Sequence, residues 1–146
     1  MTVMYLVEQE YNRYLKEVGG KIISGEDTSK EIKQARRSLN ITQAELGTIV
    51  GLRRETITRI ENGNIQSTTR FVKEFTKTIA AMKVIRDLHA LDEVSRLKGE
   101  EMNVPSIAFL SSCLNIPMQS LKLIFEIGDR RYLKKREKIL KTVKEV

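Results

Sequence analysis

Two short helical patterns joined at one glycine limit what this chain can fold into. The stretch TQAELGTIVG, from Thr42 to Gly51, carries apolar residues at helical spacing, and so does LRRETITRIENG, from Leu52 to Gly63. The apolar positions of the two patterns are Leu46, Ile49, Val50, Leu52, Ile57 and Ile60. Two helices separated by so tight a turn form a helix-turn-helix geometry.

Local signals predict where these helices begin and end. Thr42 and Glu45 have capping-box spacing, and Thr28 and Glu31 repeat it upstream, where they predict another helix. The inward residues of that upstream helix are Ile32, Ala35 and Leu39, and Asn40, Asn62 and Gly63 are residue types that end helices. Gly47 lies inside a helical pattern, where its missing side chain would let the two short helices approach closely.

Strand patterns are nearly absent from the rest of the chain, which predicts an all-α protein. A first helix is expected over residues 2–18, ended by Gly19-Gly20. The connector after it, KIISGED, has Ile22 and Ile23 as expected apolar anchors. Further helices are expected to open at Pro105 and Pro117.

A long apolar-periodic stretch over residues 70–98 extends past what one small domain needs. Phe71, Phe75 and Ile79 are expected to close the core of the helix-turn-helix region. The later apolar positions are Ala81, Val84, Ile85, Leu88, Leu91, Val94 and Leu97. They fit either a second helix pair within the chain or a dimer interface. The expected division is an N-terminal helix and connector (1–27), a DNA-binding domain (28–82), and a helical dimerisation or accessory region (83–146).

Positive charge is concentrated in two places. The 146 residues carry a formal net charge of +7, which favours polyanionic partners. Residues 29–64 hold seven Lys and Arg against four Glu, and residues 128–146 hold eight against three Asp and Glu. The last segment predicts a helix with an apolar stripe opposite its lysines, which fits a solvated face or a DNA contact.

Several function classes lack their usual residues. The lone Cys113 excludes an intramolecular disulfide and a Cys-rich zinc site, and the lone His89 predicts no metal site. No Gly-rich phosphate loop or catalytic constellation is present, so neither an enzyme nor a bound cofactor is expected. No apolar run approaches the length of a membrane span and no signal-peptide pattern opens the chain, which predicts no membrane partner and a cytoplasmic location.

From Ile32 to about Met82 the chain resembles the helix-turn-helix family of phage repressors, Cro proteins and the XRE-like microbial regulators. The resemblance rests on Thr-Gln-x-x-Leu from Thr42, the Gly51-Leu52 turn, Ile57 and Ile60, and the closing Glu-Asn-Gly. It implies an all-α, repressor-like five-helix DNA-binding domain, here with helical N-terminal and C-terminal extensions. It also implies double-stranded DNA as a partner.

The resemblance assigns roles to individual residues. The recognition helix is expected at about 53–62, and its base-contacting positions are Arg54, Glu55 and Arg59, together with Arg53, which contacts either a base or a phosphate. The positions expected at phosphates are Thr42, Gln43, Thr56, Asn62 and Asn64. Arg36 and Glu61 match a structural ion pair of the family. The alternative for the charged residues is plain solvent exposure, or an ion pair between Glu55 and Arg59, four residues apart.

Two positions depart from the family pattern: Arg53 stands where a Ser or Thr usually caps the recognition helix, and Gly47 replaces an alanine. The function expected from the whole pattern is a sequence-specific transcriptional regulator that binds DNA as a homodimer. The alternative is an antitoxin or bridging coactivator that acts mainly through a protein partner. No effector ligand is indicated by the sequence.

Overall fold

The computed structural model describes residues 3–97 and 107–128, and every element in that part of the chain is a helix. The helices are α1 (Val3–Ser24), α2 (Thr28–Ser38), α3 (Gln43–Val50), α4 (Arg54–Glu61), α5 (Thr69–Leu97), α6 (Ile107–Leu114) and a last one at Met118–Gly128. The expected all-α class is confirmed. The basic segment beyond residue 128 and the helix start at Pro105 lie outside the described residues.

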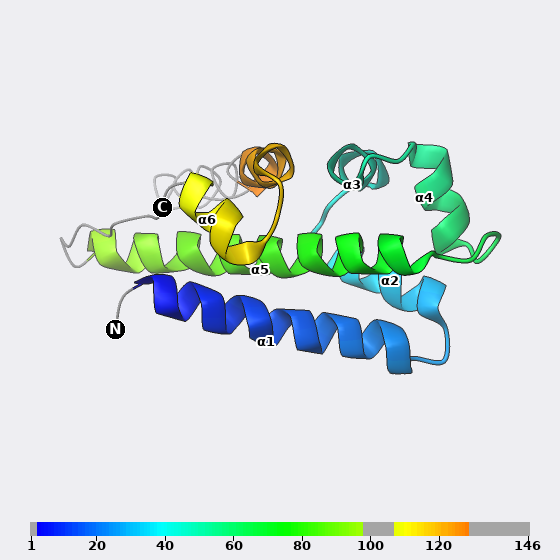
Figure 1. Cartoon of the computed structure of the whole chain (residues 1–146), viewed down its shortest axis with the longest axis horizontal. Helices are drawn as coiled ribbons and strands as arrows, with labels where there is room; N and C mark the ends of the chain where they lie inside the picture. Colours follow the sequence, from blue (N-terminus) through cyan, green and yellow to red (C-terminus); the bar gives the residue numbers. More distant parts are fainter. Residues whose placement is uncertain (1–2, 98–106, 129–146) are drawn as a thin grey trace, which may run out of the picture.

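Two long helices form the base of the molecule. α1 and α5 lie side by side and antiparallel, and the shorter helices pack around α5 (Figure 1). The residues of α1 that recur every three or four positions are buried: Val7, Tyr11, Tyr14, Val18 and Ile22. The Tyr14 hydroxyl also donates a hydrogen bond to Asp87 on α5. The Tyr11 hydroxyl has no hydrogen-bond partner among the described residues, and burial raises the pKa of Tyr11 to about 12.

The expected end of the first helix at Gly19-Gly20 is wrong, because α1 continues to Ser24. Val18 and Ile22 stand one turn apart and are both buried, so packing on this face outweighs the roughly 1 kcal/mol that each glycine costs a helix. Ile22 is an anchor as expected. Ile23 is not, since its side chain is 80% exposed.

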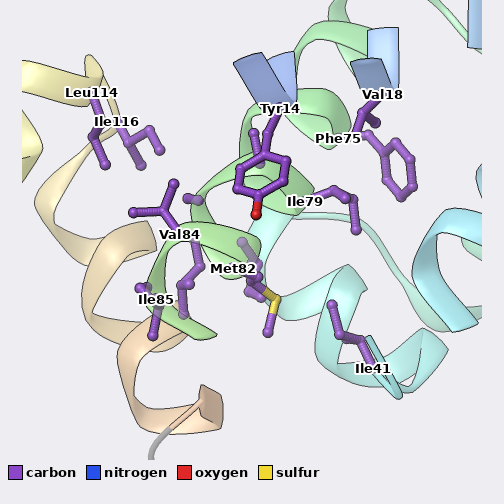
Figure 2. Packing of buried hydrophobic residues seen from close by; sticks show 14 of the residues in the cluster. Tyr14, Val18, Ile41, Phe75, Ile79, Met82, Val84, Ile85, Leu114 and Ile116 are labelled. Atoms are coloured by element: carbon purple, nitrogen blue, oxygen red, sulfur yellow. The ribbon is translucent and has the colours of Figure 1, made fainter. Parts of the chain in front are cut away.

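α5 is one unbroken helix of 29 residues. Its first turns bury Phe71, Phe75 and Ile79, as expected. The next apolar positions, Ala81 to Leu88, are buried inside the same chain, in one cluster with residues of α1 and of the C-terminal helices (Figure 2). An intramolecular helix pair therefore accounts for this part of the stripe. Residue 82, the expected domain boundary, lies within α5.

The C-terminal segment buries several apolar side chains in the same cluster, whereas Phe109 and Met118 are exposed. The buried residues are Leu110, Leu114, Ile116, Leu121, Ile124 and Ile127. Pro117 immediately precedes the last helix, in keeping with the expected start. Within residues 3–97 and 107–128, no single helix has the length and apolarity to cross a membrane, although α6 and the Met118–Gly128 helix together satisfy both criteria as a pair bent by 116°.

Candidate nucleic-acid interface

α2 begins one residue earlier than its capping signal predicted. Asp27, in extended backbone, is the N-cap, and its carboxylate accepts a hydrogen bond from the Lys30 N–H at 3.2 Å. The expected capping box of Thr28 and Glu31 is therefore wrong, because Thr28 is already helical. Asp and Thr are both good caps, and the backbone geometry selects Asp27. At the other end Asn40 adopts the left-handed conformation, as its residue type indicated.

α3 is closed at both ends by its own residues. The Thr42 hydroxyl accepts from the Glu45 N–H at 3.0 Å, and the Glu45 carboxylate accepts from the Thr42 N–H at 2.9 Å, which confirms the capping box. Gly51 follows α3 with φ at 76°, a conformation that favours glycine. These contacts define where α3 starts and where the chain turns toward α4.

The turn presses closely against α3 at Gly47. The Leu52 N–H donates to the Gly47 carbonyl at 2.9 Å. A Cβ atom placed on Gly47 would lie 2.5 Å from the Leu52 carbonyl oxygen, which is closer than non-bonded atoms approach. Gly47 is thus required by the backbone of the turn, which explains the departure from alanine. Leu52 itself does not continue the buried pattern, since it is 37% exposed.

α4 is anchored by its apolar face and its C-terminal end. Ile57 and Ile60 are buried, as expected. After Glu61, the Gly63 N–H donates to the Ile60 carbonyl and the Asn64 N–H to the Arg59 carbonyl, which is the Schellman pattern. At the other end Arg53 occupies the N-cap position in extended backbone and makes no side-chain capping bond.

A buried ion pair joins α4 to α2. Arg36 Nε lies 2.6 Å from Glu61 Oε2, and Arg36 Nη2 lies 2.8 Å from Glu61 Oε1, so the two groups meet in a bidentate arrangement. Arg36 Nη1 also donates to the Ile41 carbonyl at 2.7 Å. The side chains are 10% and 0% exposed. This pair, which the family resemblance implied, fixes the last turn of α4 against the domain.

Gln43 extends this network to α3. Its Nε2 donates to Glu61 Oε1 at 3.1 Å, and its Oε1 accepts from the Thr58 hydroxyl at 2.9 Å. The two bonds fix the orientation of the amide and leave the second Nε2 hydrogen unassigned. Thr58 was missed from the sequence, because no spacing rule connects residues 43 and 58 and the pairing exists only once α3 and α4 are packed.

The charged side chains of α4 remain outside the network. Arg53, Arg54, Glu55 and Arg59 are exposed, and their side chains form no hydrogen bond or ion pair with any residue in the described ranges. The alternative pair of Glu55 with Arg59 is therefore not formed here. Three guanidinium groups and one carboxylate thus project from a short, fixed helix, and these groups can pair with guanine and cytosine edges in a DNA groove.

The residues expected at phosphates surround α4. Thr42, Asn62 and Asn64 are exposed, and Gln43 and Thr56 are half-buried. Thr42 precedes α3, whereas Asn62 and Asn64 follow α4, so polar groups lie at both ends of the two-helix unit. In the part of the chain that the structure describes, no cluster of three His, Cys, Asp or Glu side chains could hold a metal ion.

Comparison with known proteins finds a family that matches one segment of this arrangement. Residues 32–75 match the helix-turn-helix family, a segment that begins in α2, contains α3 and α4, and ends in the first turns of α5. No curated protein and no solved structure matched the chain.

Proposed function

We propose that the chain is a sequence-specific transcriptional regulator, on the premise that residues 32–75, which match the helix-turn-helix family, form a DNA-binding domain of the phage repressor and Cro type. In this proposal α4 is the recognition helix and enters the major groove of double-stranded DNA with its N-terminal half toward the bases. A regulator of this kind must have access to DNA. The cytoplasmic location expected from the sequence is compatible with this requirement.

The observation that carries the proposal is the contrast between the two sides of α4. Its inner side is held by Ile57, Ile60 and the buried Glu61, while Arg54, Glu55 and Arg59 are exposed without partners among the described residues. A fixed backbone lowers the entropy lost when the side chains meet a base edge. No internal ion pair has to be broken first. Both conditions favour direct contact with bases.

The surrounding polar residues are proposed to contact phosphates. Thr42 and Thr56 offer hydroxyl groups, and Asn62 and Asn64 offer amides. Gln43 donates one Nε2 hydrogen to Glu61 and accepts from Thr58 through Oε1, so its second Nε2 hydrogen is left for a phosphate oxygen. Such contacts set the register of the protein on DNA and carry no sequence information of their own. Arg53, at the N-cap, is proposed to contact either a base or a phosphate.

We propose a homodimer as the binding form. α4 has eight residues and so extends about 12 Å, which covers only a few base pairs. Two such helices related by two-fold symmetry contact half-sites about one helical turn, roughly 34 Å, apart. Doubling the number of contacted bases is what allows one site to be distinguished among many competing sequences.

Selection of bound fragments from random double-stranded DNA tests these statements together. The expected result is an enriched pseudo-palindrome with its half-sites about one turn apart. Arg54→Ala and Arg59→Ala should each weaken cognate binding by about 1–3 kcal/mol and relax the preference at one base position. Arg13→Ala, which removes an exposed arginine paired with Glu10 on α1, is the matched control and should have little effect.

The outcomes separate the competing possibilities. Equal weakening of cognate and random DNA by Arg54→Ala would contradict base contact at that position. Enrichment of one isolated half-site would contradict the homodimer. If no sequence were enriched at all, sequence-specific regulation would be wrong and a role through a protein partner would be favoured.

A further inference from the structure

A groove separates the helix-turn-helix unit from the last helix. It has a volume of about 530 Å³, within the range of small-molecule sites. Three segments form its walls: the end of α3 with the turn after it, the first turns of α5, and the start of the Met118–Gly128 helix. The residues used below are Val50, Leu52, Arg70, Phe71, Ser120 and Leu123. None of the residues proposed above to contact DNA lines this groove.

Each of the three walls contributes at least one apolar side chain among polar ones. Val50 comes from the end of α3, Leu52 from the turn, Phe71 from α5, and Leu123 from the last helix. Leu52 is 37% exposed, as a large apolar side chain in an exposed turn. An apolar body placed in the groove would cover this surface and would gain about 25 cal/mol for each Å² removed from water.

Two side chains of opposite charge, Arg70 and Glu74, line the groove. Arg70, in the first turn of α5, is exposed, and its side chain makes no hydrogen bond or ion pair with any described residue, so its guanidinium is available to an anion. Glu74 lies one turn further along the same helix and also lines the groove, yet the two residues form no ion pair. A ligand with one negative charge can approach Arg70, whereas Glu74 disfavours a ligand with further negative charges.

We propose that this groove binds a small organic acid that has one carboxylate and an apolar body. The carboxylate pairs with Arg70, and the apolar body lies against Leu52, Phe71 and Leu123. Compact anions such as inorganic phosphate lack the apolar part and gain little beyond a screened surface contact. The proposal rests on the groove alone and holds whether or not α4 contacts bases.

Fluorescence titration of the full chain, without DNA, tests the proposal. The probe is 8-anilinonaphthalene-1-sulfonate, an aromatic anion whose emission rises in apolar surroundings, and octanoate is added to displace it. The expected result is saturable probe binding that octanoate reverses. Octanol, which lacks the charge, and inorganic phosphate, which lacks the apolar chain, should displace the probe at least about fivefold less well.

Two variants locate the site. Arg70→Gln should weaken octanoate binding about fivefold to tenfold, because one charge-assisted contact is lost. Lys73→Gln, which removes an exposed charge from α5 outside the groove, is the control and should leave octanoate binding unchanged. Ser120→Trp should block binding by filling the groove, with the helical circular dichroism spectrum and the thermal unfolding midpoint used to verify the fold.

Each result decides the question. Loss of octanoate binding in Arg70→Gln and Ser120→Trp, but not in Lys73→Gln, supports the site. Equal octanoate affinity in all four proteins would place the probe elsewhere and overturn the proposal. Equal displacement by octanol and octanoate would overturn the carboxylate as the group recognised. None of these readings depends on DNA, so failure here is distinct from failure of the regulator proposal.

Discussion

The two helices of the helix-turn-helix unit have the same length but are stabilised in different ways. α3 and α4 each contain eight residues. α3 has a reciprocal capping box at its N-terminus and few charged side chains. α4 has no side-chain cap at Arg53, and its stabilising contacts lie on its inner face and at its C-terminal end, where Glu61 and the turn through Asn64 hold it.

This difference shows how a helix can be fixed in place while one end stays open. The N-terminal amides of a helix need acceptors, and a Ser or Thr cap usually supplies one. At α4 the position carries an arginine, which cannot accept a hydrogen bond. The proposed DNA interface uses this end, where phosphate oxygens could accept from the same amides. α3, which is proposed to contact DNA with fewer groups, keeps its own cap.

The largest expected effect comes from breaking the C-terminal anchor of α4. Glu61→Ala would leave the buried Arg36 guanidinium without its partner and should lower the free energy of unfolding by about 3 kcal/mol, measured by urea denaturation. The double variant Arg36→Met/Glu61→Leu removes both charges and is the control, which should recover most of that loss. A loss below 1 kcal/mol in Glu61→Ala would show that α4 is held mainly by Ile57 and Ile60.

A second test concerns the close approach at Gly47. Gly47→Ala should destabilise the protein by about 1–3 kcal/mol, because the added methyl group meets the Leu52 carbonyl and the turn must shift. Gly20→Ala is the matched control on α1, where a Cβ has nothing within 4 Å. That change should stabilise the protein by up to about 1 kcal/mol through helix propensity. Thermal unfolding of the two variants should therefore move in opposite directions.

Exchanging the capping chemistry of the two helices tests the comparison directly. Thr42→Ala removes the cap of α3 and should cost about 1 kcal/mol of stability. Arg53→Ser supplies a cap to α4 and should add up to about 1 kcal/mol while weakening DNA binding. Urea denaturation and a DNA titration of the same samples measure both quantities. If Arg53→Ser left DNA affinity unchanged, Arg53 would have no role in the interface.

The smallest expected effect concerns the hydrogen bond between the two helices. Thr58→Val keeps the side-chain shape and removes the donor to Gln43, so stability should fall by about 0.5–1 kcal/mol in urea denaturation. Thr48→Val is the control, because the Thr48 hydroxyl bonds only to the Ala44 carbonyl of its own helix. A loss no larger than that of the control would show that Thr58 does not brace Gln43.

The sequence predicted those features of the fold that depend on neighbouring residues. Thr42 and Glu45 form their capping box, and Asn40, Gly51 and Gly63 adopt the left-handed backbone that their residue types allow. The apolar spacing also identified the buried residues of α4. In each case the physical cause lies within about five residues of the chain, so a local pattern is sufficient.

The sequence-based predictions failed where contacts between distant segments of the chain determine the local structure. Gly19 and Gly20 do not end α1, because packing of Val18 and Ile22 continues the helix. Leu52 is exposed because the turn directs it toward the groove. The bond from Thr58 to Gln43 depends on the packing of α3 against α4. The proposed contacts of Arg54 and Arg59 stay predictions until DNA binding is measured.

The continuity of α5 has a mechanical consequence. At 1.5 Å per residue its 29 residues form a rod of roughly 43 Å, and the same rod begins in the core of the helix-turn-helix unit and continues beneath the C-terminal helices. The helix has no break anywhere between Thr69 and Leu97. If two chains associate through α5 or the helices packed on it, a rigid structure fixes the distance between their two α4 helices. Such a pair would tolerate little variation in half-site spacing, since an inserted base pair also rotates one half-site around the duplex.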